Sequence, residues 1–215
     1  CGYFDAAMGQ LDKGANDYSR QVAQAVAEYA MECSINKVFA TEALDRTADE
    51  GVQIHGGYGY IQEYMIERIY RDSRINRIFE GTNEINRLLI PGTLLKRVLK
   101  GELPLMEAAG NLQQELVTYM PPLFSGDEPL EQEKEMIRSA KKIFLMVGGS
   151  AVQKFQLELE QQQEVLKYLA DIIIAIYAME SAWLRTKKNA LRDQTSSNPA
   201  LQTNYTQVIV HELMA

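Results

Sequence analysis

The sequence predicts an all-α protein built from two successive helical units. Apolar residues recur at intervals of three and four over most of the 215 residues, which is the period of amphipathic helices. Runs that alternate between apolar and polar residues, the pattern of half-buried strands, are scarce. Glycine and proline residues fall between the periodic segments, where they end one helix and start the next. These three observations favour helical bundles over any fold that contains a sheet.

The first predicted elements are helices with polar caps. A short helix is predicted over 3–11, and Asn16 or Asp17 could cap the next one. Ser34 is the predicted cap of a long helix that continues to Ile54. The Gly56–Gly57 pair should end that helix, because glycine is the residue that most readily takes the left-handed conformation at a helix end.

A compact irregular region is predicted over 58–83, with a short helix at 65–71 inside it. Another helix follows from about Asn83, with Ile85, Leu88, Leu89 and Leu94 as its apolar positions. Pro91 should kink or interrupt it, because proline lacks the backbone N–H that an interior turn requires. The segment 101–104 predicts the boundary between the two helical units.

The second half predicts a helical bundle. Its helices are expected over 105–120, 130–158 and 160–191, with a turn at 125–127 and a last helix that begins with Pro199 as its first residue. The chain opens without a starting methionine and closes within a helical pattern. We therefore expect it to be a piece of a longer protein.

Composition limits the classes of function. The chain is 46% hydrophobic and 24% charged, as in ordinary soluble proteins, and its net charge of −7 makes general affinity for nucleic acid unexpected. The two cysteines, Cys1 and Cys33, form neither a disulfide framework nor a zinc pattern, so no metal is expected. The most apolar stretch, 168–184, is interrupted by Asp171 and Glu180 and falls short of a membrane span.

Three clusters between residues 53 and 87 do not fit packing alone. Gly56, Gly57 and Gly59 could let the backbone approach a ligand such as a phosphate, or could form a simple helix stop. They do not make a GxGxxG after a strand, so a nicotinamide dinucleotide site is not indicated. The charged residues Arg71, Asp72, Arg74 and Arg77 favour a salt-bridge network over an anion site.

Glu80 is the candidate for proton transfer. It lies between Phe79 and Gly81, just before a helix that Thr82 or Asn83 could cap. A carboxylate in such a setting can be partly desolvated, which makes it a stronger base. The alternative is an acid that simply favours a helix start through the helix dipole.

Taken together, three segments resemble the carboxy-terminal domain of the acyl-CoA dehydrogenase family. They are Gln53-Ile54-His55-Gly56-Gly57, Arg71-Asp72-Ser73-Arg74-Ile75 and Phe79-Glu80-Gly81-Thr82-Asn83-Glu84-Ile85. The likeness extends over about 35–97, and the part after Gly101 resembles, more weakly, the extra helical domain of the very-long-chain branch. The resemblance implies a truncated carboxy-terminal helical bundle over 1–100 and an appended helical domain, itself truncated at its end, over 101–215.

The resemblance also implies an activity, in which a fatty acyl-CoA is oxidised to a trans-2-enoyl-CoA in β-oxidation with FAD as cofactor. Glu80 matches the base that removes the α-proton, and its backbone N–H would polarise the thioester carbonyl. Gly81 matches a residue that lines the acyl-CoA site. The matching cofactor-binding residues are Gln53, Ile54, His55, Gly56 and Gly57, often on the FAD of a neighbouring subunit, and Thr82, Asn83 and Glu84.

The expected partners are a fatty acyl-CoA, electron-transferring flavoprotein as electron acceptor, and further copies of the chain. A cytoplasmic location of the bacterial type is expected, with the mitochondrial matrix as the alternative. Because the family's amino-terminal helical domain and middle β domain are absent, this piece alone is expected to bind FAD weakly and to be inactive. Three other interpretations stay open: a non-catalytic helical interaction module, a membrane-surface module and an acyl-CoA oxidase relative, although Thr82 favours the dehydrogenase.

Overall fold

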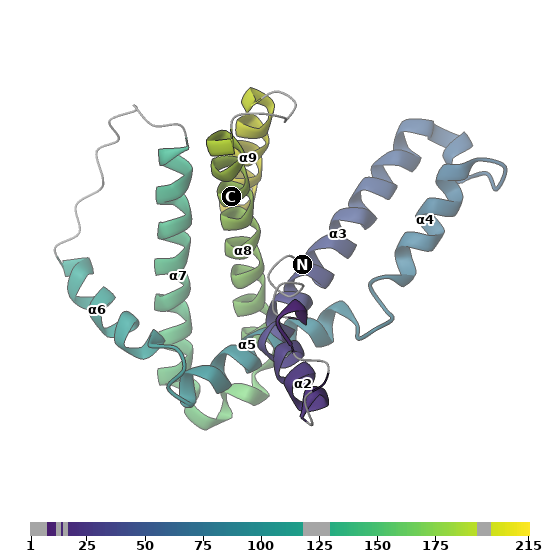
Figure 1. Cartoon of the computed structure of the whole chain (residues 1–215). Coiled ribbons are helices and arrows are strands. Elements are labelled where there is room, and N and C mark those ends of the chain that lie inside the picture. Colours follow the sequence, from purple (N-terminus) through teal and green to yellow (C-terminus); the bar gives the residue numbers. More distant parts are fainter. Residues whose placement is uncertain (1–7, 12–13, 15–16, 118–129, 193–198) are drawn as a thin grey trace. The chain divides into compact units, whose positions relative to one another are not determined.

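The computed structural model describes residues 8–11, 14, 17–117, 130–192 and 199–215. Every regular element in these ranges is a helix, and no strand occurs among them (Figure 1). The predicted all-α class is therefore confirmed. None of the described helices is long and apolar enough to cross a membrane.

The chain divides into two compact units, Cys1–Thr93 and Leu94–Ala215. The domain limits predicted from the sequence, 1–100 and 101–215, remain a prediction. The helices of the first unit are α2 (Tyr18–Glu28), α3 (Ala30–His55), the 3-10 helix η1 (Gly56–Tyr60), α4 (Met65–Ile75) and the first part of α5 (Asn83–Leu99). Within this unit α3 and α4 pack side by side, and η1 lies at the turn between them (Figure 1).

Helix α3 starts before its predicted cap. It begins at Ala30, so Ser34 lies inside the helix, where it is buried, and the predicted Ser34 cap is wrong. Ile35, Val38 and Ala48 form the buried part of the same helix. The predicted end is confirmed, because Gly56 follows the last helical residue with a φ of 59°.

Helix α4 is longer than predicted and runs to Ile75. The irregular segment that presents the candidate base is therefore short, from residue 76 to residue 82. Of the short helix predicted over 3–11, only residues 8–11 are described, and the rest lies outside the described residues. The predicted cap residue Asp17 directly precedes α2, but its side chain makes no capping bond to the backbone.

Helix α5 continues through Pro91 without the interruption that the sequence suggested. The face it buries also differs from the prediction. Ile90 and Pro91 are buried, together with Asn83 at the start of the helix, whereas Ile85 and Leu89 are exposed. Packing of Ile90 and Pro91 offsets the cost of a proline inside the helix, which is about 3 kcal/mol in an exposed setting.

The second unit is the predicted helical bundle. Its helices are α6 (Leu105–Val117), α7 (Glu131–Phe155), the 3-10 helix η2 (Gln156–Gln161), α8 (Gln163–Arg192) and α9 (Pro199–Met214). A buried cluster of Ile137, Ala140, Met179 and Val210 joins α7, α8 and α9. Pro199 is the first residue of α9, as predicted. The turn predicted at 125–127 lies outside the described residues.

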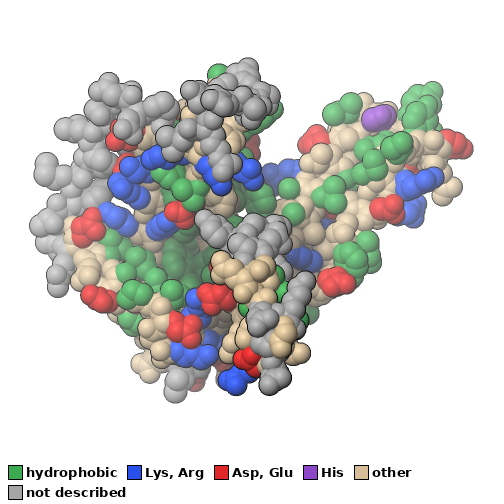
Figure 2. All heavy atoms as spheres, viewed as in Figure 1, with side chains coloured by type: hydrophobic (Ala, Val, Ile, Leu, Met, Phe, Trp, Pro, Cys, Tyr) green, Lys and Arg blue, Asp and Glu red, His purple; other side chains and the backbone are tan. Residues whose placement is uncertain are grey.

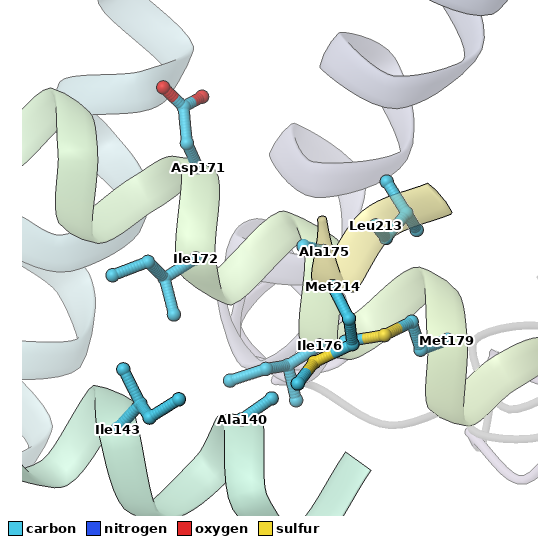
Figure 3. A pocket seen from close by; sticks show the side chains of 9 residues that line it. All are labelled: Ala140, Ile143, Asp171, Ile172, Ala175, Ile176, Met179, Leu213 and Met214. Atoms are coloured by element: carbon cyan, nitrogen blue, oxygen red, sulfur yellow. The ribbon is translucent and has the colours of Figure 1, made fainter. Parts of the chain in front are cut away.

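An apolar hollow of about 350 Å³ opens on this bundle (Figure 3). Its lining comes from α7, α8 and α9, and Asp171 is its one charged member. Ile143 and Ile176 are among the apolar side chains that line it, and Met214 lines it from the last turn of α9. None of the residues singled out from the sequence as site residues lines this hollow.

Candidate active site at the loop between α4 and α5

The loop before α5 places two consecutive residues in the left-handed backbone region. Glu80 has a φ of 57° and Gly81 a φ of 82°. Glycine adopts this conformation at little cost, but for another residue it costs about 1–2 kcal/mol. The Asn83 N–H closes the loop by donating to the Arg77 carbonyl at 3.1 Å. A strained non-glycine residue persists only where its surroundings fix it, and such residues gather at functional sites.

Two side chains hold the carbonyl of Gly81. The ammonium of Lys37, on α3, donates to it at 2.8 Å, and the amide of Asn86, on α5, donates at 2.9 Å. Lys37 also donates to Oδ1 of Asn83 at 2.6 Å. The turn that carries Glu80 is therefore anchored to both neighbouring helices.

Asn83 is the centre of a polar network between α3 and α5. Its side chain is 2% exposed, and its Nδ2 donates to Oγ1 of Thr41 at 3.0 Å and to Oε1 of Glu42 at 3.1 Å. Arg87 forms two hydrogen bonds to the Glu42 carboxylate, at 2.6 and 2.9 Å. Hydrogen bonds of this kind are directional, so the network fixes the register of α5 on α3.

The network shifts the pKa values of its members. Burial raises the pKa of Glu42, but the hydrogen bonds from Arg87 and Asn83 outweigh burial and hold the pKa below its ordinary value. Burial lowers the pKa of Lys37, and the charges of Glu84 and Glu42 offset only part of that effect. The pKa of Glu84 is lowered by a hydrogen bond from its own backbone N–H and by a second one from Thr82.

Of the two predicted caps, Thr82 is the one that caps α5. Its Oγ1 accepts a hydrogen bond from the backbone N–H of Ile85 at 3.2 Å. The Asn83 side chain is instead buried, where it bonds to Thr41 and Glu42, and its backbone N–H bonds to the Arg77 carbonyl. Its contact with FAD stays a prediction, and any such contact would have to replace one of these bonds.

Glu80 itself is exposed, and Phe79 beside it is 48% exposed. The described residues do not provide the partial desolvation expected from Phe79, and desolvation of Glu80 stays a prediction for the longer protein. Within the described part of the chain, the backbone N–H of Glu80 donates to no other residue. The exposed Glu80 side chain is thus accessible to an approaching molecule, and the N–H is not engaged by another described residue.

The three glycines after α3 have two different roles. A Cβ added to Gly56 or Gly57 would meet nothing within 4 Å, so their backbone is open to a ligand. A Cβ on Gly59 would lie 2.6 Å from the Val52 carbonyl oxygen, so packing alone explains this glycine. Nδ1 of His55 lies 2.8 Å from the Gly51 carbonyl, within hydrogen-bonding distance, and the contact of His55 with FAD stays a prediction.

The structure does not bring the two predicted cofactor-binding groups to one place. Lys37 contacts the Glu80–Gly81 turn, whereas Gln53 lies sixteen residues further along the same helix. At a rise of 1.5 Å per residue, this separates the two groups by about 24 Å along α3. Gln53–Gly57 and Thr82–Glu84 therefore lie at opposite ends of the α3–α4 pair (Figure 1).

Exposed apolar side chains gather at the end of the pair that carries η1 (Figure 2). Ile54, Tyr60 and Met65 are 82%, 78% and 75% exposed. Such a concentration of exposed apolar residues is typical of a surface that another molecule covers.

The charged patch predicted from the arginines is not a single network. Arg71 pairs with Glu67 one turn earlier on α4, and Arg77 pairs with Asp45 on α3 at 3.2 Å. Arg71 and Arg77 thus stabilise the helix and its packing separately, which supports the structural interpretation over an anion site.

Sequence reasoning missed Lys37, Thr41 and Glu42 as parts of the site. A signal for them does exist, because Lys37, Thr41 and Asp45 follow each other at four-residue spacing and so line one face of α3. A polar stripe on a helix that also has buried residues predicts polar partners on a neighbouring segment. The sequence alone does not say which segment that is.

With the geometry in place, comparisons with known proteins assign the family. Two family models, both described as "Acyl-CoA dehydrogenase, C-terminal domain", match residues 5–95 and 139–215. The described helices are thus those of the carboxy-terminal part of a flavoenzyme-type dehydrogenase fold, and the chain belongs to the acyl-CoA dehydrogenase family. The family recognised from the sequence motifs is confirmed.

Individual relatives agree with this assignment. The chain is 54% identical, over 98% of its length, to a "Probable acyl-CoA dehydrogenase" of Bacillus subtilis (strain 168), of which it covers 35%. It is 32% identical, over 75% of its length, to the "Very long-chain specific acyl-CoA dehydrogenase, mitochondrial" of Bos taurus, of which it covers 27%.

A solved structure also matches this chain over nearly its whole length. The crystal structure of an acyl-CoA dehydrogenase complexed with FAD from Bacillus anthracis superposes with a TM-score of 0.91 at 52% identity. The match covers 99% of this chain and 36% of that one. The chain thus spans about a third of the length of the two Bacillus proteins.

Proposed function

We propose that the protein to which this chain belongs is an FAD-dependent dehydrogenase of fatty acyl-CoA thioesters, and that Glu80 is its catalytic base. The observation that carries the assignment of the base is the φ of 57° at Glu80. A non-glycine residue held in this conformation, with an exposed carboxylate and no packing role, is better explained by a reaction than by stability.

The proposed reaction converts an acyl-CoA to a trans-2-enoyl-CoA. The Glu80 carboxylate accepts the proton of the carbon next to the thioester carbonyl, and the electron pair of that C–H bond forms the new double bond. FAD, when bound, supplies the ring that accepts the hydride leaving the neighbouring carbon. The backbone N–H of Glu80 donates to the thioester oxygen and so stabilises the charge that develops there.

Gly81 is proposed to line the acyl-CoA site beside this base. Its φ of 82° disfavours any side chain, and an added Cβ would lie 3.2 Å from Nδ2 of Asn86. Without a side chain, Gly81 leaves the approach to the Glu80 carboxylate open. Its carbonyl can also accept the hydrogen bonds from Lys37 and Asn86.

The residues proposed to contact FAD fit a cofactor shared between copies of the chain. Gly56 and Gly57 offer an exposed backbone, and Gln53, Ile54 and His55 are exposed beside them. Because the second group, Thr82–Glu84, lies about 24 Å away along α3, we propose that the two groups serve the FAD molecules of different subunits. The exposed apolar end of the α3–α4 pair supports such a homo-oligomer.

The remaining parts of the proposal rest on the family alone. We propose a role in fatty acid β-oxidation, electron-transferring flavoprotein as the electron acceptor, and a cytoplasmic location of the bacterial type. The isolated chain should bind FAD weakly, because it carries only two of the segments that contact the cofactor.

The experiment uses the full-length protein with FAD bound. Glu80→Gln keeps the size of the side chain but cannot accept a proton. The rate at which an acyl-CoA bleaches the flavin under anaerobic conditions should fall by about 10²–10⁴-fold or more. Glu80→Asp keeps the carboxylate but withdraws it by one methylene, and an intermediate rate is expected. Bleaching of Glu80→Gln at the parent rate would place the base on another residue.

A further inference from the structure

We propose that Lys37 is a positioning residue that aims the Glu80 carboxylate by holding the carbonyl of Gly81, an inference that rests on the proposed role of Glu80. Lys37 does not reach the reacting atoms. It acts through the left-handed turn of Glu80 and Gly81, which it ties to α3.

The two anchors of the Gly81 carbonyl are not equivalent. Asn86 lies five residues further on, in the first turns of the helix that the loop itself leads into. It therefore moves with the loop and fixes only local geometry. Lys37 lies 44 residues earlier, on a different helix, and it fixes the turn relative to the rest of the unit.

The ammonium of Lys37 is itself held in place. Nδ2 of Asn83 donates to the Glu42 carboxylate and to the Thr41 hydroxyl. This arrangement fixes the orientation of the Asn83 amide, because its donor end must face the carboxylate. Oδ1 of Asn83 is then turned toward Lys37, whose Nζ lies 2.6 Å away.

Lys37 is used differently from three arginines of the same unit, each of which forms an ion pair. Arg87 pairs with Glu42, Arg77 with Asp45 and Arg71 with Glu67. Among the described residues, the hydrogen bonds of the Lys37 ammonium go to a backbone carbonyl and an amide oxygen, and no ion pair includes it. The partly buried Lys37 ammonium donates to two neutral oxygens, those of Gly81 and Asn83. These bonds are better explained by a role in holding the backbone of the turn than by neutralisation of a charge.

The test compares four variants of the full-length FAD-bound protein. Lys37→Met removes the donors at similar volume, and Lys37→Arg keeps charge and donors. Thr47→Val is the control on the same helix, because the described bond of the Thr47 hydroxyl goes to the Ala43 carbonyl and not to the site. Glu80→Gln tests the base itself. The measured quantities are the limiting rate of anaerobic flavin bleaching, the acyl-CoA concentration that gives half of it, and the flavin content.

Lys37→Met is expected to lower the limiting rate by about 10–100-fold, because a misplacement near 1 Å can cost about a hundredfold. The half-saturating concentration and the flavin content should stay close to those of the parent. Lys37→Arg should recover part of the rate, and Thr47→Val should leave the rate unchanged. In a Glu80→Gln background, Lys37→Met should cause no further loss, because both changes act through the same group.

The outcomes separate the two proposals. If Glu80→Gln bleaches at the parent rate, the proposed base is wrong. If Glu80→Gln loses the rate but Lys37→Met keeps it, or if Thr47→Val loses as much as Lys37→Met, the positioning role is wrong and the base stands. Should Lys37→Met fail to fold, Lys37→Gln, whose N–H donor is one bond shorter and uncharged, is judged by the same criterion.

Discussion

Three non-glycine residues in the described part of the chain have a positive φ: Glu80, Leu130 and Gln156. Two of them, one in each unit, lie just before an α-helix, and their surroundings differ. Leu130 has a φ of 64° and precedes α7, and Glu80 has a φ of 57° and lies three residues before α5. In both places a nearby carbonyl is held by a side chain. Nε1 of Trp183 donates to the Leu130 carbonyl at 3.2 Å, and Lys37 donates to the carbonyl of Gly81.

The side chains of the two residues explain their strain in different ways. Leu130 is 7% exposed, so burial of its side chain offsets the cost of the backbone conformation. Glu80 is exposed and gains nothing comparable. The strain at Leu130 is therefore a consequence of packing, whereas the strain at Glu80 is maintained by the polar network of Lys37, Asn83 and Asn86. This difference is what we expect between a turn fixed by packing and a turn that presents the proposed base.

Truncation of the Leu130 and Glu80 side chains tests whether only the first of the two contributes to stability. Leu130→Ala should lower the free energy of unfolding by about 2–5 kcal/mol, as expected for a buried leucine. Glu80→Ala should change it by no more than about 0.5 kcal/mol, as at other exposed positions. Urea denaturation of the chain followed by circular dichroism measures both values. Equal losses for the two variants would remove the distinction.

The polar network can be tested at its centre. Asn83→Ala removes the hydrogen bonds that the buried Asn83 amide makes with Lys37, Thr41 and Glu42, and it should cost about 1–3 kcal/mol. Asn76→Ala is the matched control, because the Asn76 amide bonds only to the Asp72 and Ser73 carbonyls of its own helix. The same denaturation experiment compares them. If Asn76→Ala lowered the free energy of unfolding as much as Asn83→Ala, the network around Asn83 would contribute no more to stability than an ordinary surface bond.

The backbone of the turn can be tested with two glycines that should respond in opposite directions. Gly81→Ala places a Cβ on a residue with a φ of 82°, and it should cost about 1–2 kcal/mol. Gly92→Ala adds a Cβ inside α5 with nothing within 4 Å, and it should stabilise the protein by about 0.5–1 kcal/mol. Thermal denaturation gives both signs. Destabilisation at Gly92 would contradict the assignment of an open helical site.

The smallest expected effect concerns pH. The folded-state pKa values of Glu42 and Glu84 lie below the ordinary value of 4.5. Their contribution to stability is therefore complete above that value and is lost as the pH falls through the lower folded-state values. Stability measured between pH 7 and pH 3 should fall in the acidic part of this range, and less steeply in Glu42→Gln. An unchanged slope in that variant would contradict the role of the Arg87 and Asn83 bonds.

Much of the fold followed from the sequence because helical periodicity and glycine stops are local signals. Gly56 ended α3 and Pro199 began α9 as predicted. The errors arose where tertiary packing overrode local preference. Ser34 was a plausible cap, but α3 extends past it because the helix buries it together with Ile35. Ile90 and Pro91 are buried, and α5 therefore continues through the proline.

The site was only partly predictable for a similar reason. The motif around Glu80 could be recognised, and the Thr82 cap followed from local chemistry. The desolvation expected of Glu80 could not be judged, because exposure depends on what other segments cover. The contact between Lys37 and Gly81 spans 44 residues of sequence, and no local pattern encodes such a pairing.

The proposed base is Glu80, held in place by the turn of Glu80 and Gly81. The most direct test is anaerobic bleaching of the flavin in the full-length protein, with Glu80→Gln compared with Glu50→Gln. Glu50 is an exposed acid on α3 that takes no part in the site. Glu80→Gln should lose about 10²-fold or more of the bleaching rate with its flavin retained, and Glu50→Gln should keep the parent rate. Bleaching by Glu80→Gln as fast as by Glu50→Gln would contradict the assignment of Glu80 as the base.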